Sequence, residues 1–405
     1  MPGRKRIYLC LAKMSETGLE EKYIQEAFDT NWVAPVGANI DGFEADLKRF
    51  LGGDREVVCF SSGTAAIHLA LLLCGVGPGD EVLVQSFTFC ASAHPVAYLG
   101  ATPVFVDSEK DSWNMDPELL EEAVRDRIAK TGKVPKAIVP AALYGMPYQI
   151  DRILAVADKY GIPVVEDAAE GMGSTFGGRM LGTFGKFGVL SFNGNKMITT
   201  SGGGALICED AKTKEKAVWY AMQAREAYPY YQHEHIGYNY RISNICAGIG
   251  RGQMSVADAH IAHHRHVQAR YEELLREVPG ITMHGNPDTP GQAGGSCFDS
   301  NFWLCSCTIA PEIRVKGQEK VSPRSSGEPN GNVEALRLFL DRAGIETRPL
   351  WKPMHRQPVY KSAPAYVNGV SDALFRLGLC LPAGPRVSDA DVRYIAKTLK
   401  SALTA

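Results

Sequence analysis

The sequence predicts an α/β protein in which a mostly parallel sheet of seven strands lies between layers of helices, followed by a smaller α+β domain. Between Val57 and Ile207, short apolar runs alternate with helical patterns, the order expected of a parallel sheet with helical crossovers. The runs are continuously apolar, as in strands that are covered on both faces. A chain of 405 residues with 45% hydrophobic residues is long enough for two or three domains.

The expected elements follow from these runs in chain order. The seven predicted strands are residues 57–60, 81–85, 103–106, 137–140, 163–166, 188–192 and 204–208. Helical patterns fill 115–129 and 148–160, and one long helix is expected from 243 to 278. We expect residues 1–278 to form an N-terminal arm and the large domain. In the small domain, residues 279–405, we expect a strand at 302–309 and helices at 332–343 and 388–402.

Composition excludes several classes of protein. The net charge of -2 provides no basic footprint for a nucleic acid. Two long uncharged stretches, 57–79 and 82–106, are interrupted by glycine, proline and polar residues, so we expect no membrane span. None of the ten cysteines is spaced C-x-x-C, and most have apolar neighbours. This usage predicts reduced thiols, no metal site and a cytoplasmic location.

The first chemical signal is a run of small and hydroxylic residues, Ser61 to Ala66, which follows the first strand and opens a helical pattern. Free backbone N–H groups and the helix dipole meet at such a turn, and hydroxyls add donors, so it is typical of an anion site. An ordinary helix N-cap is the alternative, because Ser and Thr favour that position in any case.

The second and third signals are a carboxylate and a lysine. Asp167 follows the apolar strand that ends at Glu166, and ligands of open α/β sheets gather at such strand ends. Helix capping is the alternative for Asp167. Lys196 follows another apolar strand and precedes a glycine-rich turn. Alone it would be read as a surface lysine, but an amine held among apolar neighbours is a usable nucleophile.

In combination these signals match the needs of pyridoxal phosphate. The cofactor requires an anion site for its phosphate, a carboxylate that keeps the pyridine nitrogen protonated, and a lysine that carries its aldehyde as a Schiff base. Ser61 to Ala66, Asp167 and Lys196 occur in that order along the chain. The joint occurrence therefore favours a pyridoxal-phosphate enzyme over three unrelated structural residues.

Motifs along nearly the whole chain carry a resemblance to a known family. They are Trp32–Pro35 with Gly37, Ser62–Ala65, Ser86–Phe89, Glu166–Ala169, Gly182–Gly185, Ser191–Lys196, Tyr238–Arg241 and Arg348–Trp351. In these the chain resembles the DegT/StrS family of aminotransferases, which have fold type I, use pyridoxal phosphate and act on nucleotide-linked keto sugars. The segments 193–196, 199–204 and 348–352 look most like the branch that aminates C4 of UDP-linked 4-keto-6-deoxy-N-acetylhexosamines.

The resemblance implies a role for each matching residue. Lys196 would be the Schiff-base lysine and proton shuttle, and Asp167 would pair with the pyridine nitrogen. Phe89 would stack on the cofactor ring. Glu170 departs from the Gln or His common in the family, and beside the ring hydroxyl its carboxyl group would have to stay protonated to donate. The phosphate would be held by Gly63, Thr64, the Ala65 amide, Ser191 and, from a neighbouring subunit of a homodimer, Asn239.

The substrate side is implied in the same way. Nucleotide and sugar would be bound by Trp32, Pro35, Asn193, Arg348, Trp351 and His355. L-glutamate, the usual family donor, would supply the amino group for a bacterial glycan, capsule or other polysaccharide precursor. Three alternatives stay open: amination at C3 of a 3-keto-6-deoxy sugar, dehydration at C3, and a pyridoxal-phosphate-sensing regulator without turnover. Dehydrating relatives replace the lysine by histidine, so Lys196 disfavours that reaction.

Overall fold

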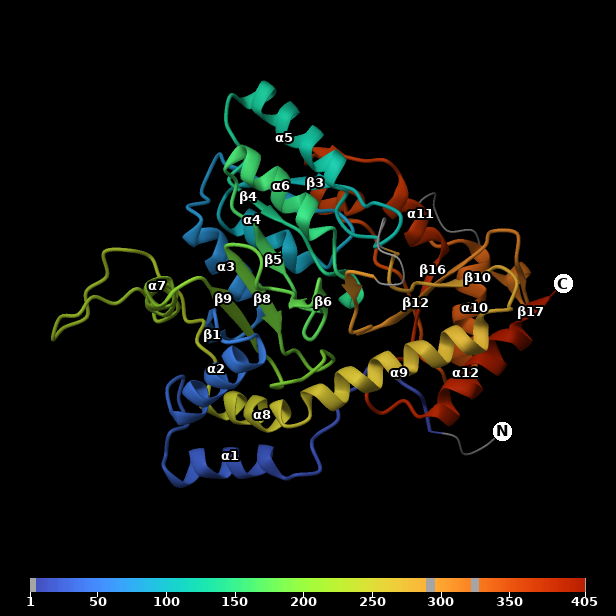
Figure 1. Ribbon diagram of the computed structural model, residues 1–405, viewed down its shortest axis with the longest axis horizontal. Helices are drawn as coiled ribbons and strands as arrows, with labels where there is room; N and C mark the ends of the chain where they lie inside the picture. Colours follow the sequence, from blue (N-terminus) through green and yellow to red (C-terminus); the bar gives the residue numbers. More distant parts are fainter. Residues whose placement is uncertain (1–4, 289–295, 322–327, 405) are drawn as a thin grey trace.

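The computed structural model describes residues 5–288, 296–321 and 328–404. Figure 1 shows a large α/β part with a smaller C-terminal part beside it. The strands of the main sheet are β1 (Glu56–Phe60), β2 (Glu81–Gln85), β3 (Thr102–Val106), β4 (Ala137–Val139), β5 (Val165–Asp167), β8 (Phe187–Ser191), β9 (Gly204–Cys208) and β15 (Ala365–Tyr366). The helices of the large part are α1 (Leu19–Asp29), α2 (Ala38–Phe50), α3 (Gly63–Leu73), α4 (His94–Tyr98), α5 (Pro117–Thr131), α6 (Ile150–Tyr160) and α7 (Ala211–Ala221).

The main sheet joins two groups of four strands. Their orders are β1-β9-β8-β5 and β15-β3-β2-β4. Parallel bridges from Ile138 to Val164 and from Ala141 to Asp167 connect β4 with β5. β9 runs antiparallel to β1 and β8, while the other neighbouring strands of this sheet run parallel. All seven predicted strands are confirmed, and β15 adds a strand from the C-terminal part.

Two apolar clusters cover the two faces of this sheet. Successive side chains of a strand point to opposite faces, so Val57 and Cys59 belong to one cluster and Val58 and Phe60 to the other. The first cluster includes residues of α2, α5 and α6, and the second includes residues of α3, α4 and α7. Burial on both faces explains why these strands are continuous apolar runs in the sequence.

The predicted helix from 243 to 278 is wrong as a single element. The structure has two helices, α8 (Asn244–Met254) and α9 (Ala257–Leu275). Between them, the Ser255 hydroxyl donates to the Gly252 carbonyl at 2.6 Å, and Val256 leaves helical geometry with φ -122° and ψ 4°. A side chain that competes for a helix carbonyl in this way favours an end of the helix.

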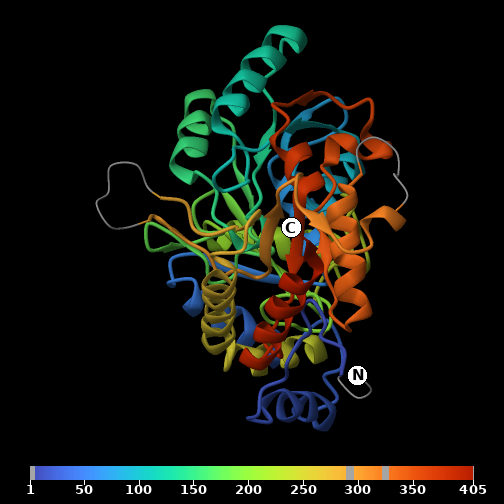
Figure 2. The same cartoon turned by 90° about the vertical axis from the view of Figure 1, so that its right-hand side faces the viewer.

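The C-terminal part has its own sheet and apolar core. The sheet has the order β10-β12-β16-β14. The elements are β10 (Ile281–Met283), β12 (Cys305–Ile309), β14 (Arg348–Pro349), β16 (Gly378–Leu381), α10 (Gly331–Arg342), α11 (Val370–Leu377) and α12 (Asp389–Ala402). Helices α10 and α12 lie side by side (Figure 2). Their core also includes Tyr271 and Leu275 of α9 and Ile7; the division after residue 278 stays a prediction.

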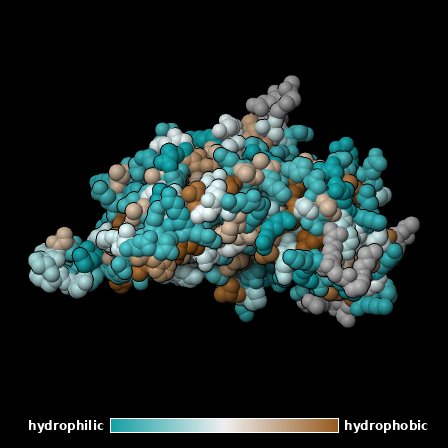
Figure 3. Space-filling model, turned by 90° about the horizontal axis from the view of Figure 1, so that it is seen from below, coloured by the Kyte–Doolittle hydropathy of each residue, from teal (hydrophilic) through white to brown (hydrophobic). Residues whose placement is uncertain are grey.

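Short strands and an arm complete the chain. The short strands are β6 (Thr175–Phe176), β7 (Arg179–Met180), β11 (Phe298–Asp299), β13 (Arg314–Val315) and β17 (Leu403–Thr404). The segment 222–240 between α7 and α8, here called the arm, projects away from the body on the left of Figure 1, and the same lobe protrudes in Figure 3. No helix within the described ranges combines the length and apolar character that crossing a membrane requires.

His264 of α9 makes the stability of the protein sensitive to acid. It is completely buried, its Nδ1 lies 3.2 Å from the Phe302 carbonyl, and burial lowers its pKa to about 3. In the unfolded chain the same imidazole has a pKa near ~6.5. The unfolded state therefore binds this proton first, and the stabilising contribution present above pH 6.5 is lost as the pH falls toward 3.

We therefore predict that His264→Gln reduces the loss of unfolding free energy between pH 6.5 and 5 by ~1.4 kcal/mol per pH unit. Urea denaturation at several pH values measures this slope. His266→Gln is the matched control, because His266 lies on the same helix but is 53% exposed and pairs with Asp389. Parallel pH profiles for wild type and His264→Gln would contradict the prediction.

Candidate active site

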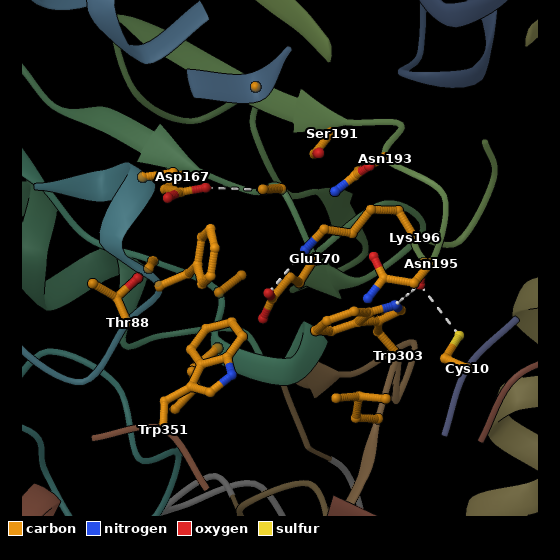
Figure 4. A pocket seen from close by; sticks show the side chains of 18 of the residues that line it. Cys10, Thr88, Asp167, Glu170, Ser191, Asn193, Asn195, Lys196, Trp303 and Trp351 are labelled. Atoms are coloured by element: carbon orange, nitrogen blue, oxygen red, sulfur yellow. Dashed lines mark hydrogen bonds and ion pairs between the residues drawn. The ribbon is translucent and has the colours of Figure 1, made fainter. Parts of the chain in front are cut away.

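A cavity of about 540 Å³ lies at the carboxyl ends of β1, β2, β4, β5 and β8. Ligands of open α/β sheets bind at this edge because loops and helix N-termini converge there. Figure 4 shows several of the lining side chains turned toward one another. The C-terminal part contributes to the wall with Trp303, Leu304, Glu346, Arg348, Pro349, Trp351 and Cys380, and the N-terminal segment contributes Leu9 and Cys10.

The N-terminus of α3 reaches the cavity and presents groups that suit an anion. Gly63 and Thr64, the first residues of α3, line the cavity together with Ser191 at the end of β8. A Cβ atom at Gly63 would lie 3.2 Å from the Ser191 Cβ, so glycine permits the close approach of helix and strand. The partial positive charge of the helix N-terminus and the two hydroxyl groups suit a phosphate.

Asp167 is buried at the end of β5 and is held by one hydroxyl group and one backbone amide. The Ser92 hydroxyl donates to Oδ2 at 2.5 Å, and the Ala169 amide donates to Oδ1 at 3.2 Å. The hydroxyls of Thr88 and Ser92 are 2.7 Å apart. Burial raises the pKa of Asp167, opposed by these hydrogen bonds and by the charge of Lys196. The carboxyl group is thus fixed in orientation and sensitive to a positive charge placed near it.

Lys196 and Glu170 form a buried ion pair. The distance from Lys196 Nζ to Glu170 Oε1 is 2.9 Å, with 13% and 7% of the two side chains exposed. The backbone N–H of Tyr144 donates to Glu170 Oε2 at 2.7 Å. Burial raises the pKa of Glu170, and the positive charge of Lys196 is the main opposing influence. In this structure Glu170 therefore accepts a hydrogen bond from the lysine, and its expected contact with a ring hydroxyl stays a prediction.

Three aromatic side chains pack against one another beside the cavity, and two of them, Phe89 and Trp351, line it. The ring of Phe89 lies 5.4 Å from that of Trp351, and the ring of Tyr144 lies 5.1 Å from it. The Trp351 backbone N–H donates to the Tyr144 hydroxyl at 2.9 Å. Tyr144 has a left-handed backbone with φ 55° and ψ 18°, an uncommon conformation for a residue with a side chain. This geometry lets one residue contact both Glu170 and the segment of Trp351.

Most of the residues that the sequence singled out line this cavity. They are Gly63, Thr64, Phe89, Asp167, Glu170, Ser191, Asn193, Lys196, Arg348 and Trp351. Of these, Arg348 lies at the rim, where its guanidinium group pairs with Glu346 at 2.9 Å and is 66% exposed. Residues that lie far apart in the sequence, from Gly63 to Trp351, therefore meet in one cavity.

Five predicted residues lie outside the cavity lining. The Ala65 amide, expected to hold an anion, instead donates to the Ser62 hydroxyl at 3.0 Å, because Ser62 caps α3. Trp32 and Pro35 are exposed in a turn that Asn244 holds against α8. His355 lies behind β2, where its Nδ1 is 2.7 Å from the Ser86 hydroxyl. Asn239 is exposed in the arm; its expected role requires a second subunit.

Sequence reasoning missed several residues that support the site. Ser92 holds Asp167, Trp303 covers Lys196, and the Cys10 thiol donates to the Asn195 carbonyl at 3.2 Å. Ser92 and Cys10 carry no local signal, since a small polar residue and an apolar cysteine are common in any core. Trp303 precedes a strand, and an aromatic residue there is normally part of the hydrophobic core.

The donor set fits pyridoxal phosphate. The helix N-terminus with Thr64 and Ser191 suits the phosphate, the buried Asp167 suits a protonated ring nitrogen, and the Lys196 amine suits an aldehyde. Phe89, whose side chain lines the cavity and is 54% exposed, offers a ring face. Among the described residues, no group of three or more His, Cys, Asp or Glu side chains is arranged to hold a metal ion.

Comparisons with known proteins agree with this chemistry. The model of the DegT/DnrJ/EryC1/StrS aminotransferase family matches residues 15–400. EpsN of Bacillus subtilis, whose name is that of a pyridoxal phosphate-dependent aminotransferase, is 42% identical over 98% of this chain and 95% of its own. The UDP-2-acetamido-2-deoxy-3-oxo-D-glucuronate aminotransferase of Pseudomonas aeruginosa is 34% identical over 90% of both chains. The crystal structure of a DegT/DnrJ/EryC1/StrS aminotransferase from Brucella abortus has a TM-score of 0.82, 28% identity and 95% coverage of both chains.

The Lys196–Glu170 pair yields a prediction about the cofactor-free protein. Glu170→Gln keeps the shape of the side chain but leaves the ammonium group without its counter-charge, so we expect a loss of about 1–3 kcal/mol of unfolding free energy. A double-mutant cycle with Lys196→Met and the double variant, followed by urea denaturation, isolates the pair. A coupling energy indistinguishable from zero would show that the ion pair contributes nothing to stability.

Proposed function

Because this chain belongs to the DegT/DnrJ/EryC1/StrS family of pyridoxal-phosphate-dependent aminotransferases, we propose that it transfers an amino group from L-glutamate to C4 of a UDP-linked 4-keto-6-deoxy-N-acetylhexosamine. The product would feed the synthesis of a bacterial glycan or polysaccharide, in the cytoplasm. The observation that carries the proposal is the buried Lys196 amine, 2.9 Å from Glu170, in the same cavity as Asp167 and the anion site of α3.

The residues of the cavity have separable tasks in this proposal. Pyridoxal phosphate supplies the aldehyde that takes up the amino group and the electron-poor ring that makes the neighbouring C–H bond acidic. Thr64, Ser191 and the α3 N-terminus would anchor the phosphate. Asp167, held in orientation by Ser92, would keep a proton on the ring nitrogen, because a carboxylate favours that proton. Phe89 would cover one face of the ring.

Lys196 would hold the cofactor covalently and move protons when released. Its Nζ would take up the proton released from the carbon of the amino donor and hold it for the next transfer, and the reverse movement would serve the sugar. Glu170 Oε1 lies within hydrogen-bond distance of this Nζ, so it would hold the amine near the reacting carbon between transfers. Two half-reactions at one lysine imply ping-pong kinetics.

The proposed substrate is more specific than family membership alone implies. It is supported by segments 193–196, 199–204 and 348–352, which look most like the C4-aminating branch, and by Asn193, Arg348 and Trp351 in the cavity wall. Trp32, Pro35 and His355 would not contact the sugar within one chain. Amination at C3 is the second candidate, because the name of one relative with 34% identity describes a 3-oxo sugar nucleotide.

A direct test is incubation with UDP-4-keto-6-deoxy-GlcNAc and ¹⁵N-labelled L-glutamate, followed by NMR of the product. We expect the label on C4. A labelled product from a 3-keto isomer alone would favour the second candidate, and a dehydrated product would contradict aminotransfer. L-alanine and L-glutamine in place of glutamate test the choice of donor.

We also propose a homodimer with a composite site. The arm projects from the body (Figure 1), and Tyr230, Tyr231 and Ile236 in it are 62%, 80% and 83% exposed. Apolar and aromatic side chains on a projecting segment favour contact with another chain. A two-fold partner would bring Asn239, at the base of this arm, to the phosphate of the neighbouring site.

Mixing two inactive variants tests this arrangement. Lys196→Ala removes the amine and should abolish turnover, and Asn239→Ala should inactivate the enzyme by weakening the phosphate site. In hybrid dimers, one site would combine Lys196 of one chain with Asn239 of the other. An equal mixture, unfolded and refolded together, should recover roughly a quarter of wild-type activity. No recovery despite hybrid formation, or a fully active monomer, would contradict the composite site.

Asp167→Asn should leave the phosphate anchor intact and slow proton transfer by several orders of magnitude. An amide does not favour a proton on the ring nitrogen, and each unit of pKa at that nitrogen corresponds to ~1.4 kcal/mol. Single-turnover reaction with L-glutamate, followed by absorbance, measures the step, and a cofactor titration measures affinity. A rate within threefold of wild type with cofactor bound would mean that Asp167 does not face the ring nitrogen.

A further inference from the structure

We propose that Trp303 is a positioning residue for Lys196, which holds the free ammonium group of this lysine on its indole face. The inference rests on the proposed role of Lys196. Figure 4 shows the Trp303 ring beside the Lys196 side chain, on a segment of the chain that belongs to neither the lysine loop nor the anion site.

Two contacts join Trp303 to the lysine loop. Lys196 Nζ lies 4.0 Å from the centroid of the Trp303 ring, a distance at which the negative face of an indole attracts a cation. The indole N–H donates to the carbonyl of Asn195 at 2.7 Å. Trp303 therefore contacts both the end of the lysine side chain and the backbone directly before it, and only 3% of its surface is exposed.

Asn301 ties the same segment to Glu170. Its side-chain amide donates to the carbonyls of Glu170 at 2.7 Å and of Met172 at 2.8 Å, while its Oδ1 accepts from the backbone N–H of Trp303 at 2.8 Å. The approach is tight, because a Cβ on Gly145 would lie 1.9 Å from the Asn301 Oδ1. One turn, 301–303, thus sets the positions of both partners of the ion pair.

The turn 301–303 has an uncommon backbone conformation at Phe302, which contacts with neighbouring residues maintain. Phe302 has φ 48°, a left-handed conformation that a residue with a large side chain rarely adopts. His264 Nδ1 lies 3.2 Å from the Phe302 carbonyl, and the Phe302 N–H donates to the Ser300 hydroxyl at 2.9 Å. These contacts direct the indole toward Lys196. An extended backbone at Phe302 would point the indole in another direction.

The arrangement distinguishes the charged amine from the neutral one. The indole face attracts an ammonium group but has little attraction for an uncharged amine. With Glu170 on one side and Trp303 on the other, the free ammonium of Lys196 has a defined position. Once it loses its proton, the amine is released from the ring. Trp303 would therefore hold the lysine ready between its proton transfers and leave substrate binding unaffected.

The test compares Trp303→Phe, which keeps a ring but loses the N–H, with Trp303→Met, which loses both. In the cofactor-free protein, acetylation of Lys196 at fixed pH is followed by mass spectrometry, a readout independent of activity. We expect labelling to be roughly 2- to 30-fold faster in the Met variant and to change less in the Phe variant. In the holoenzyme, kcat should fall in the order wild type, Phe, Met, with KM for both substrates within about threefold.

Trp219→Met is the matched control. Trp219 carries the same pair of interactions away from the cavity, with Lys216 Nζ 3.8 Å from its ring and its indole N–H donating to the Arg225 carbonyl at 3.1 Å. This variant should leave Lys196 labelling unchanged.

Labelling and kcat within twofold of wild type in Trp303→Met, with Lys196→Ala inactive, would overturn the role of Trp303 and leave the proposed function intact. An active Lys196→Ala would instead overturn the function of the lysine. If the Met variant does not fold, Trp303→Phe decides, because a benzene face attracts a cation less than an indole face: Lys196 labelling no faster than in wild type, with an unchanged kcat, overturns the proposal.

Discussion

The buried ion pair between Lys196 and Glu170 is the interaction around which the cavity is organised. A buried charge without a partner is strongly unfavourable, so each side chain requires the other. Glu170 also accepts the Tyr144 amide, which binds the segment after β4 to the pair. The Lys196 ammonium group also contacts the Trp303 ring, which brings the lysine loop close to the segment of Trp303. The positions of three separate segments therefore depend on one pair of opposite charges.

The cavity connects the two parts of the molecule. Asp167 at the end of β5 and the loops that carry Glu170 and Lys196 belong to the large part, while Trp303, Arg348 and Trp351 come from segments near the C-terminal sheet. Because these groups share one cavity, a small shift between the two parts alters both the environment of the lysine and the packing of the aromatic side chains.

Much of the fold was predictable because burial on both faces leaves a plain signal. All seven predicted strands of the large sheet lie in apolar runs, and the polar residues that follow several of its parallel strands meet at their carboxyl edge. The interruption between α8 and α9 was not predictable, since no proline or glycine lies at Ser255 and Val256. The eighth strand, β15, was missed because its two residues pair with β3 from far along the chain.

The sequence by itself determined the fold class and the order of the strands along the chain, and it predicted an anion site at Ser61–Ala66 and chemical roles for Asp167 and Lys196. Each depends on residue types at short spacing, where local backbone geometry decides what the side chains can do. Only the tertiary structure decided that Glu170 pairs with Lys196, that Ser92 orients Asp167 and that Trp303 covers the amine. These partners lie 26, 75 and 107 residues apart, and their proximity arises from packing between segments, which no local pattern records.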